Sequence, residues 1–428
     1  MVNNAIVKIW DQEAGALLLD ENSGNISFEY FPEFEKRGYE LSPILLPFVK
    51  GKVYSYPELR DNETYHGLPG FIADILPDQW GTALMERWLA ENGRPSGSYN
   101  IIERLLYMGK RGMGALEFYP ETRNDLSNSI EIKELSSLVR VAREIISSRN
   151  TVKIKFNNNS TSAIKAIISI GTSAGGSRAK AVVAYNKKTK EIRSGQVDAP
   201  EGFEHYLIKL DGVTNKILGD PQYFGCIEYS YYRIAKACGI DMTESFLLPD
   251  HKHQHFMTKR YDRIGNHKVH KVSLCGINNM DFNMPGAYSY EQLFEVMRML
   301  RLPKSDAEQS YRRMVFNVIG RNQDDHTKNF DFLMNTDGIW KLSPAFDMTY
   351  SYKKQGRWTS RHQMTINGKD EDFTREDLLK IAKDINLKNG NEIINQIKEI
   401  FKHFEEYMHP DIPDKMVSEM KSNLLLSI

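Results

Sequence analysis

The sequence predicts an α+β protein of two lobes, with a mixed α/β N-terminal part and an all-helical C-terminal lobe. Apolar and polar residues alternate over short segments in much of the first half of the chain, which is typical of strands. From Tyr288 onward the pattern is helical almost throughout, apart from one hairpin. With 428 residues the chain is long enough for two or three cores. We therefore expect three parts, over residues 1–125, 126–262 and 263–428.

Strands and helices alternate in the first two parts. Strands are predicted where β-branched and aromatic residues stand between turn residues, and helices where the apolar spacing becomes three to four. The predicted strands are Ile6–Trp10, Leu17–Asp20, Ile26–Phe31, Met113–Pro120, Lys180–Tyr185, Glu204–Leu210, Ser245–Pro249 and His255–Arg260. The predicted helices are Thr82–Asn92, Ser98–Met108, Glu131–Arg149 and Gly225–Cys238.

The third part is read as helical except for a hairpin with its turn at Asn335–Gly338. The two strands of this hairpin are predicted at Phe330–Met334 and Gly338–Leu342. The predicted helices are Tyr290–Leu300, Asp306–Gly320, Arg375–Ile385, Glu392–Met408 and Lys415–Leu425.

Composition excludes several classes of protein. The 56 basic and 56 acidic side chains balance, which argues against strong binding of nucleic acid or of a membrane surface by this chain alone. The three cysteines lack CxxC spacing, so a disulfide framework or a structural zinc is not expected. No apolar run approaches the roughly 18 residues that a membrane-spanning helix requires. We expect a soluble cytoplasmic protein with no membrane contact.

The run Asn322–Asn329 and the later segment Ser343–Asp347 carry the most informative chemistry. They place Asp324, Asn329 and Asp347 in the order acid, amide five positions on, and second acid beyond the hairpin. Phosphoryl transfer in a kinase-like fold uses one carboxylate to orient the attacking hydroxyl, and an amide oxygen and a second carboxylate to hold Mg²⁺. A D-x-x-x-x-N match alone arises by chance on the order of once in a chain of this length. The alternative is a solvated polar loop between a core helix and a hairpin.

Two further segments are candidates for phosphate contact. Gly171–Lys180 is rich in glycine and precedes a strand, so its backbone N–H groups could approach a phosphate, although a plain turn is the alternative and no Walker A ending is present. Lys209 lies among apolar residues of a strand, where it either faces solvent or contacts an anion. The kinase arrangement would pair Lys209 with a glutamate on the next helix, and Glu228 has that position. The candidate phosphate-contacting residues in these two segments are Ser173, Ala174, Gly175, Gly176, Lys180 and Lys209.

The junction Lys259–Arg263 would be the hinge that contacts the adenine, with Lys259 and Tyr261 as candidate contacts. Lys328, which precedes Asn329, completes the expected nucleotide contacts. The alternative is that Asp262 and Arg263 only cap the end of a strand. His251, His253 and His255 alternate on one predicted strand face, but no spacing of carboxylates supports a metal site there.

Taken together, these segments resemble the HipA family, whose members are serine/threonine protein kinases that form the toxin half of bacterial toxin–antitoxin pairs. The likeness covers nearly the whole chain, with Gly67–Gly81 and Met113–Pro120 resembling the N-terminal region of the family. It implies a kinase that uses ATP and Mg²⁺, with Asp324 as the catalytic aspartate that accepts the proton of the substrate hydroxyl and with Asn329 and Asp347 as metal ligands. It also implies that autophosphorylation of Ser173 in the Gly-rich loop silences the enzyme.

The resemblance implies partners as well. These are a HipB-like helix-turn-helix antitoxin, DNA reached only through that antitoxin, and a translation protein such as an aminoacyl-tRNA synthetase as substrate. Asp325 stands where the family has a small residue, and we expect its side chain to face solvent rather than bind a further metal ion. Two other functions stay open, namely a non-catalytic co-repressor that binds the antitoxin and a small-molecule kinase of related fold.

Overall fold

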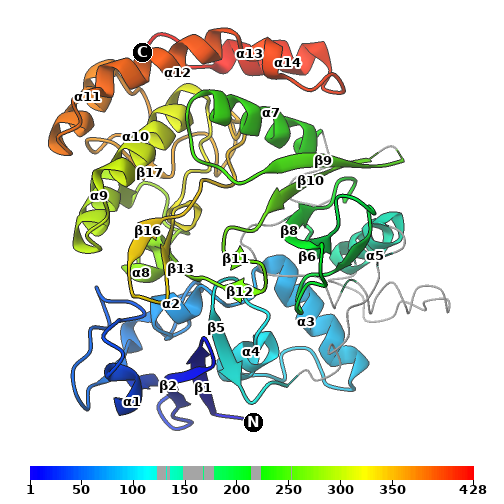
Figure 1. The fold of residues 1–428 in the computed structure, drawn as a ribbon, viewed down its shortest axis with the longest axis vertical. Coiled ribbons are helices and arrows are strands. Elements are labelled where there is room, and N and C mark those ends of the chain that lie inside the picture. Colours follow the sequence, from blue (N-terminus) through cyan, green and yellow to red (C-terminus); the bar gives the residue numbers. More distant parts are fainter. Residues whose placement is uncertain (123–131, 133–134, 148–166, 168–177, 214–222, 252) are drawn as a thin grey trace. The chain divides into compact units, whose positions relative to one another are not determined.

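A computed structural model describes residues 1–122, 132, 135–147, 167, 178–213, 223–251 and 253–428 (Figure 1). The chain forms two compact units. The first comprises residues 1–41, 48–222 and 246–271, and the second comprises residues 42–47, 223–245 and 272–428.

The first unit begins with a five-stranded sheet of order β4-β3-β2-β1-β5 whose neighbouring strands are all antiparallel. Its strands are β1 (Asn4–Ile9), β2 (Gln12–Leu19), β3 (Ile26–Tyr30), β4 (Val53–Ser55) and β5 (Leu116–Tyr119). The accompanying helices are α1 (Pro32–Glu35), η1 (Pro57–Leu59), α2 (Gly70–Ala73), α3 (Gln79–Glu91) and α4 (Ile101–Met108). Asn100 caps α4 with Glu103 in a reciprocal capping box, which explains why the helix starts later than the apolar pattern predicts.

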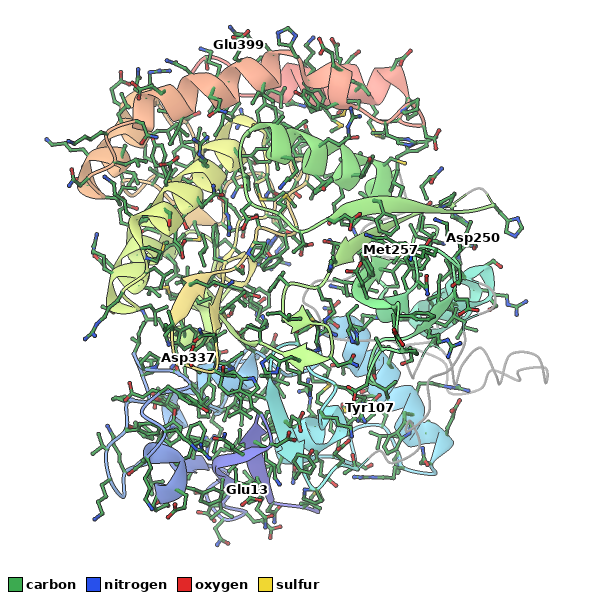
Figure 2. All side chains as sticks on the ribbon, viewed as in Figure 1. Glu13, Tyr107, Asp250, Met257, Asp337 and Glu399 are labelled. Atoms are coloured by element: carbon green, nitrogen blue, oxygen red, sulfur yellow. The ribbon has the colours of Figure 1, made fainter. Side chains whose placement is uncertain are left out.

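A second sheet in this unit has the order β7-β6-β8-β10-β9. Its strands are β6 (Lys180–Tyr185), β7 (Ile192–Ser194), β8 (Glu204–Lys209), β9 (Ser245–Asp250) and β10 (His253–Lys259). Side chains of this sheet, of α3 and of α5 (Leu135–Ser147) form one core, in which Trp80, Val183, Tyr206 and Met257 are almost fully buried. Met257 of this core is labelled in Figure 2. A short hairpin of β11 (Arg263–Ile264) and β12 (His267–Lys268) follows.

The second unit is mainly helical, and Figure 1 shows α12, α13 and α14 following one another beside α7 and α10. Its helices are α7 (Phe224–Ala237), α8 (Leu274–Ile277), α9 (Tyr290–Met299), α10 (Lys304–Ile319), η3 (Thr327–Asn329), α11 (Arg375–Asp384), α12 (Gly390–Lys402), α13 (Phe404–Tyr407) and α14 (Asp414–Asn423). Tyr231 of α7 contacts the rings of Phe316, Phe401 and Phe404, so an aromatic cluster joins four helices.

The expectation of an all-helical C-terminal part is corrected by two small sheets. One has the order β13-β15-β16, and in its strand β13 the chain passes from the first unit into the second. The other is a parallel pair, β14 with β17. The strands are β13 (His270–Ser273), β14 (Tyr288–Ser289), β15 (Asp331–Met334), β16 (Trp340–Leu342) and β17 (Met364–Thr365). The predicted hairpin, β15 with β16, is confirmed. β14 and β17 have two residues each, which is too short for an alternating pattern in the sequence.

The division into residues 1–125, 126–262 and 263–428 stays a prediction. Among the described residues, no helix is both long enough and apolar enough to cross a lipid bilayer.

Candidate active site

The loop that carries Asp324 starts at a fixed point, because α10 ends against the aromatic cluster. Gly320, which follows α10, accepts a hydrogen bond at its carbonyl from the Tyr231 hydroxyl at 2.7 Å. A Cβ atom at Gly320 would lie 2.4 Å from the ring of Phe401, so no larger residue fits without moving that ring. The core of the second unit therefore sets where the loop begins.

Asp324 keeps its carboxylate partly accessible, with the side chain 41% exposed. Its Oδ1 accepts a hydrogen bond from the Trp358 indole at 2.6 Å and lies 3.8 Å from His326 Nε2. Its Oδ2 accepts no hydrogen bond from the part of the chain that the structure describes. One oxygen is thus held in place while the other faces outward, which suits a group that receives a proton.

Asn329 lies in η3 and is oriented by the same loop. Its Nδ2 donates to the backbone carbonyl of Asp324 at 2.7 Å, which leaves Oδ1 as the acceptor end of the amide. The preceding Thr327 is buried, and its hydroxyl donates to the Met280 carbonyl at 2.6 Å. The spacing of five positions between acid and amide therefore closes a compact turn instead of a free loop.

The segment that carries Asp347 is paired with backbone at both ends. Ala345 N donates to Asp241 O at 2.7 Å, and Ser351 N donates to Arg321 O at 3.0 Å. Gln323 N in turn donates to Ser351 O at 3.2 Å, so this segment is bound to the loop that precedes Asp324.

Asp347 itself has φ 52°, a left-handed conformation that costs a non-glycine residue about 1–3 kcal/mol. Such strain is typical of functional sites, where the surrounding structure imposes it.

Asp325 corrects the expectation that its side chain faces solvent. It is buried, and its carboxylate accepts hydrogen bonds from the Tyr290 hydroxyl, His362 Nδ1 and Gln363 N, each at 2.8 Å. Burial and the Asp325 charge raise the pKa of Tyr290 well above its usual value, so the phenol stays a donor. Asp325 therefore fixes β17 and the residues before it beneath the loop, while its neighbour Asp324 points outward.

The first unit brings the two predicted phosphate lysines together. Lys180 in β6 and Lys209 in β8 are directly paired in an antiparallel register, so their side chains share one face of the sheet. Lys180 is buried with Nζ 3.5 Å from an Asp78 carboxylate oxygen, and Lys209 Nζ lies 5.8 Å from the centre of the Phe256 ring. Two ammonium groups on one sheet face are suited to an anionic ligand.

The predicted hinge, Lys259–Arg263, is stabilised by ion pairs. The Lys259 ammonium is hydrogen-bonded to the Glu204 carboxylate, which holds the pKa of Glu204 below its usual range. Tyr261 is half-buried in the turn after β10.

Asp262 lies buried between Arg260 at 2.6 Å and Arg263 at 2.9 Å, and it also accepts from Gly114 N at 2.6 Å. Burial alone would raise the pKa of Asp262, but the two guanidinium groups hold it well below the usual range. Asp262 thus does more than cap a strand end, since it ties the residues after β10 to those before β5.

The remaining predicted residues are placed as follows. Ser173, Ala174, Gly175 and Gly176 lie outside the described residues. Lys328 Nζ lies 4.6 Å from the centre of the Phe282 ring. Glu228 is buried on α7 in the second unit and Lys209 belongs to the first, so their pairing stays a prediction.

Several residues at the site were not predicted from the sequence. Trp358, His362 and Gln363 follow Asp347 in a stretch without apolar periodicity, and only the fold brings them to Asp324 and Asp325. The sequence offers one signal for them, namely that the stretch between Asp347 and α11 is rich in polar and aromatic residues.

Comparison with known proteins identifies the family. The HipA N-terminal domain family matches residues 5–119, and the HipA-like C-terminal domain family matches residues 172–406. The chain therefore belongs to the HipA family, as the resemblance in its motifs indicates.

Two curated relatives and one solved structure are similar to parts or all of this chain. A Haemophilus influenzae protein named "Putative kinase" is 28% identical over 134 residues, which are 28% of this chain and 39% of that protein. A Sinorhizobium fredii protein named "Putative kinase Y4mE" is 25% identical over 126 residues, which are 27% of this chain and 30% of that protein. The match thus spans less than half of either relative. HipA in the Shewanella oneidensis HipA, HipB and operator DNA complex has the same fold, with a TM-score of 0.69 at 17% identity over 98% of this chain and 96% of that one.

Proposed function

We propose that this protein is an ATP- and Mg²⁺-dependent serine/threonine protein kinase of the HipA toxin type. One observation carries the proposal: an outward-facing carboxylate, Asp324, whose backbone binds the Asn329 amide and whose loop is paired with the segment bearing Asp347. Family membership and the naming of two relatives as kinases support it.

The residues fit the chemistry of phosphoryl transfer. Asp324 Oδ2 would accept the proton of the attacking hydroxyl while Trp358 holds Oδ1 in place. The Asn329 amide oxygen and the Asp347 carboxylate are the hard oxygen donors that Mg²⁺ prefers. When bound there, Mg²⁺ would neutralise charge on the transferred phosphoryl group. Lys180 and Lys209, paired on one sheet face, would attract the nucleotide phosphates.

Regulation and partners are part of the proposal. Phosphate added to Ser173 would place a dianion beside the nucleotide phosphates, and the repulsion would silence the enzyme. The Shewanella complex, in which HipA is assembled with HipB and operator DNA, supports a HipB-like helix-turn-helix antitoxin as partner, with DNA reached through it. The proposed substrate is a cytoplasmic translation protein such as an aminoacyl-tRNA synthetase.

The proposal is tested with wild type and two variants, each incubated with Mg-ATP and analysed by intact-mass and peptide mass spectrometry. Wild type should gain phosphate on the peptide that contains Ser173. Asp324→Asn should lose at least about 100-fold in rate, as expected on removing a general base. Asp347→Ala should be inactive because a metal ligand is lost.

The matched control is Asp337→Asn, which changes an exposed acid in the turn between β15 and β16 (Figure 2) and should leave the rate unchanged. ATP binding by Asp324→Asn, measured by calorimetry, should stay within about threefold of wild type because the acid contacts the hydroxyl and not the nucleotide. Undiminished phosphorylation in Asp324→Asn would remove that residue from the mechanism. ATP binding without any phosphate transfer would instead favour a non-catalytic co-repressor.

A further inference from the structure

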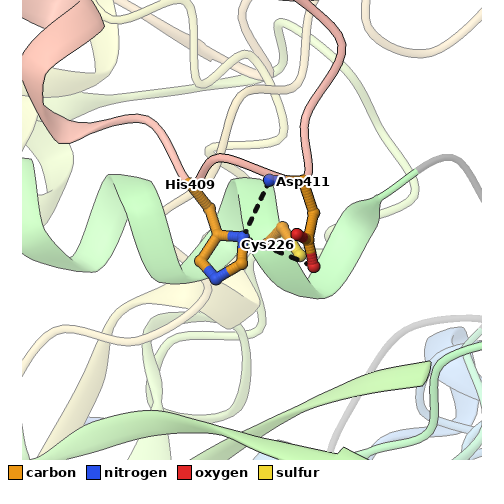
Figure 3. Close-up of side chains that lie close together, drawn as sticks. All are labelled: Cys226, His409 and Asp411. Carbon is orange, nitrogen blue, oxygen red and sulfur yellow. Dashed lines mark hydrogen bonds and ion pairs between the residues drawn. The ribbon is translucent and has the colours of Figure 1, made fainter. Parts of the chain in front are cut away.

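A thiol, an imidazole and a carboxylate lie close together in the second unit (Figure 3). Cys226 lies in the first turn of α7, and His409 and Asp411 lie in the loop between α13 and α14. One ligand atom from each lies within 4.8 Å of those of the other two. None of the three belongs to the proposed kinase machinery.

The loop is held against α7 by hydrogen bonds that do not use the three ligand groups. The Ser230 hydroxyl accepts from His409 N at 3.0 Å and donates to the Cys226 carbonyl at 2.8 Å. One turn further along α7, Arg233 donates to the Tyr407 carbonyl at 3.0 Å. The backbone that presents the three side chains is therefore arranged before any ligand arrives.

We propose that Cys226, His409 and Asp411 bind a zinc ion. Sulfur, nitrogen and oxygen donors are the ligands zinc takes, at bond lengths of about 2.0–2.3 Å that separate tetrahedral ligands by about 3.3–3.8 Å. A contraction of about 1 Å from the present arrangement satisfies this geometry. Asp411 is exposed, so water completes the fourth position.

Binding replaces an existing contact and releases one proton. His409 Nδ1 now accepts from Asp411 N at 3.3 Å and lies 3.7 Å from Asp411 Oδ2 (Figure 3). The metal takes the lone pair of Nδ1, and the Cys226 thiol loses its proton to solvent as the Zn–S bond forms. Zinc affinity therefore rises with pH until the thiol is fully ionised.

The chemistry favours zinc over two other uses of the same groups. A thiolate is a soft ligand that discriminates against Mg²⁺ and Ca²⁺. Cys226 is only 2% exposed, which denies a substrate the access that a nucleophilic thiol requires. A buried sulfur with an exposed carboxylate opposite fits an ion that enters from the solvent side.

The ion would anchor a helix that begins without a side-chain cap. Tyr223 at the N-cap of α7 makes no side-chain capping bond, and Cys226 is the third residue of the helix. Zinc would join this turn to the loop before α14, so the chain should unfold at a higher temperature with zinc than without. This inference is independent of the proposed kinase activity.

The test uses the full-length protein after chelator treatment, titrated with zinc alone in a calorimeter. Wild type should bind one equivalent that Asp411→Asn binds at least about tenfold more weakly, because one of three protein ligands is lost. The matched control, Asp414→Asn, changes an exposed acid three positions along and should bind like wild type. Both changes lie on the surface, so neither threatens folding.

A cobalt titration reports the sulfur directly. Wild type should show the near-ultraviolet charge-transfer absorption of a cobalt-bound thiolate. Cys226→Ser should lose it, whereas Cys238→Ser, which changes another buried cysteine, should keep it. Equal zinc affinity in Asp411→Asn and wild type, no stoichiometric zinc binding, or a thiolate band that survives Cys226→Ser would each overturn the assignment.

Discussion

At the level of single residues, the adjacent acids Asp324 and Asp325 have different environments, one exposed and one buried. Asp324 is 41% exposed and makes a hydrogen bond with Trp358, whereas Asp325 is buried and satisfied by three donors. Both have the same side chain and are adjacent in the sequence, and the sequence alone led us to expect Asp325 to face solvent. Only the position of β17 decides which acid is inside.

Replacing Asp325 with alanine should destabilise the protein strongly. The Tyr290 hydroxyl and His362 Nδ1 would stay buried without an acceptor, at a cost of about 2–4 kcal/mol. Asp324→Ala should cost less than about 1 kcal/mol, because the site is open to water. Urea unfolding of both variants beside wild type measures the difference, and equal stabilities would contradict the structural role of Asp325.

His270 should make stability depend on pH in the acid range. The ring is buried, burial lowers its pKa to about 4, and Nε2 lies 2.9 Å from the Leu41 carbonyl, to which it donates when neutral. Because the folded-state pKa is below the unfolded value of 6.5, the unfolded chain binds protons first. Stability should therefore be complete above pH 6.5 and fall by at most about 3 kcal/mol as the pH drops toward 4.

The measurement is the urea midpoint between pH 4 and pH 7 for wild type and His270→Gln. Glutamine keeps an N–H donor for Leu41 but does not titrate, so the variant should lose stability less steeply with acid. A slope as steep as that of wild type would assign the pH dependence to other groups.

At the scale of secondary structure, helices were predictable because their ends carry local signals. The Thr374 hydroxyl accepts from Asp377 N at 3.3 Å, and Thr374 N donates to the Asp377 carboxylate at 2.9 Å, so α11 starts where the sequence indicates. The predicted helix Glu392–Met408 is interrupted at His403, between α12 and α13. Strands of two or three residues, such as β7, β14 and β17, were missed because their pairing depends on distant partners.

Thr374→Ala should destabilise the protein by about 1 kcal/mol, the usual cost of losing an N-cap side chain. Thr336→Ala, which changes an exposed threonine in the turn before β16, is the matched control and should change stability by less than about 0.5 kcal/mol. Chemical denaturation of the two variants compares them, and an equal effect would mean that the cap of α11 contributes little.

At the scale of the whole molecule, the chain passes more than once between the two units. Residues 223–245 belong to the second unit although residues on both sides of them belong to the first. α7 supplies Tyr231 to the aromatic cluster, and Asp241 accepts the hydrogen bond from Ala345. The second unit is therefore not a contiguous piece of sequence.

A fragment of residues 272–428 should accordingly fail to unfold cooperatively. Without Tyr231, the rings of Phe316, Phe401 and Phe404 lose the partner that fills the space between them. Circular dichroism in urea should show a broad change for the fragment and a sharper one after addition of a peptide of residues 223–245. A sharp transition of the fragment alone would show that α7 is dispensable.

Some residues of the candidate site are close together in the sequence, whereas others are brought together only by the fold. Asp324 and Asn329 were predictable because five positions of one loop bring them together, and Lys180 and Lys209 because each ends or begins a clear strand. Trp358 was not, because 34 positions separate it from Asp324 and the two residues share no regular spacing.

The stretch from Ala345 to Ser351 is clamped at both ends, to Asp241 and to Arg321, with Asp347 between the clamps. Because both ends are held, the backbone cannot absorb an inserted or deleted residue. Such a change would reorient the Asp347 side chain. The backbone hydrogen bonds therefore constrain the length of this stretch, while the proposed metal site constrains the identity of Asp347. These seven residues should therefore align without gaps in distant relatives of this protein.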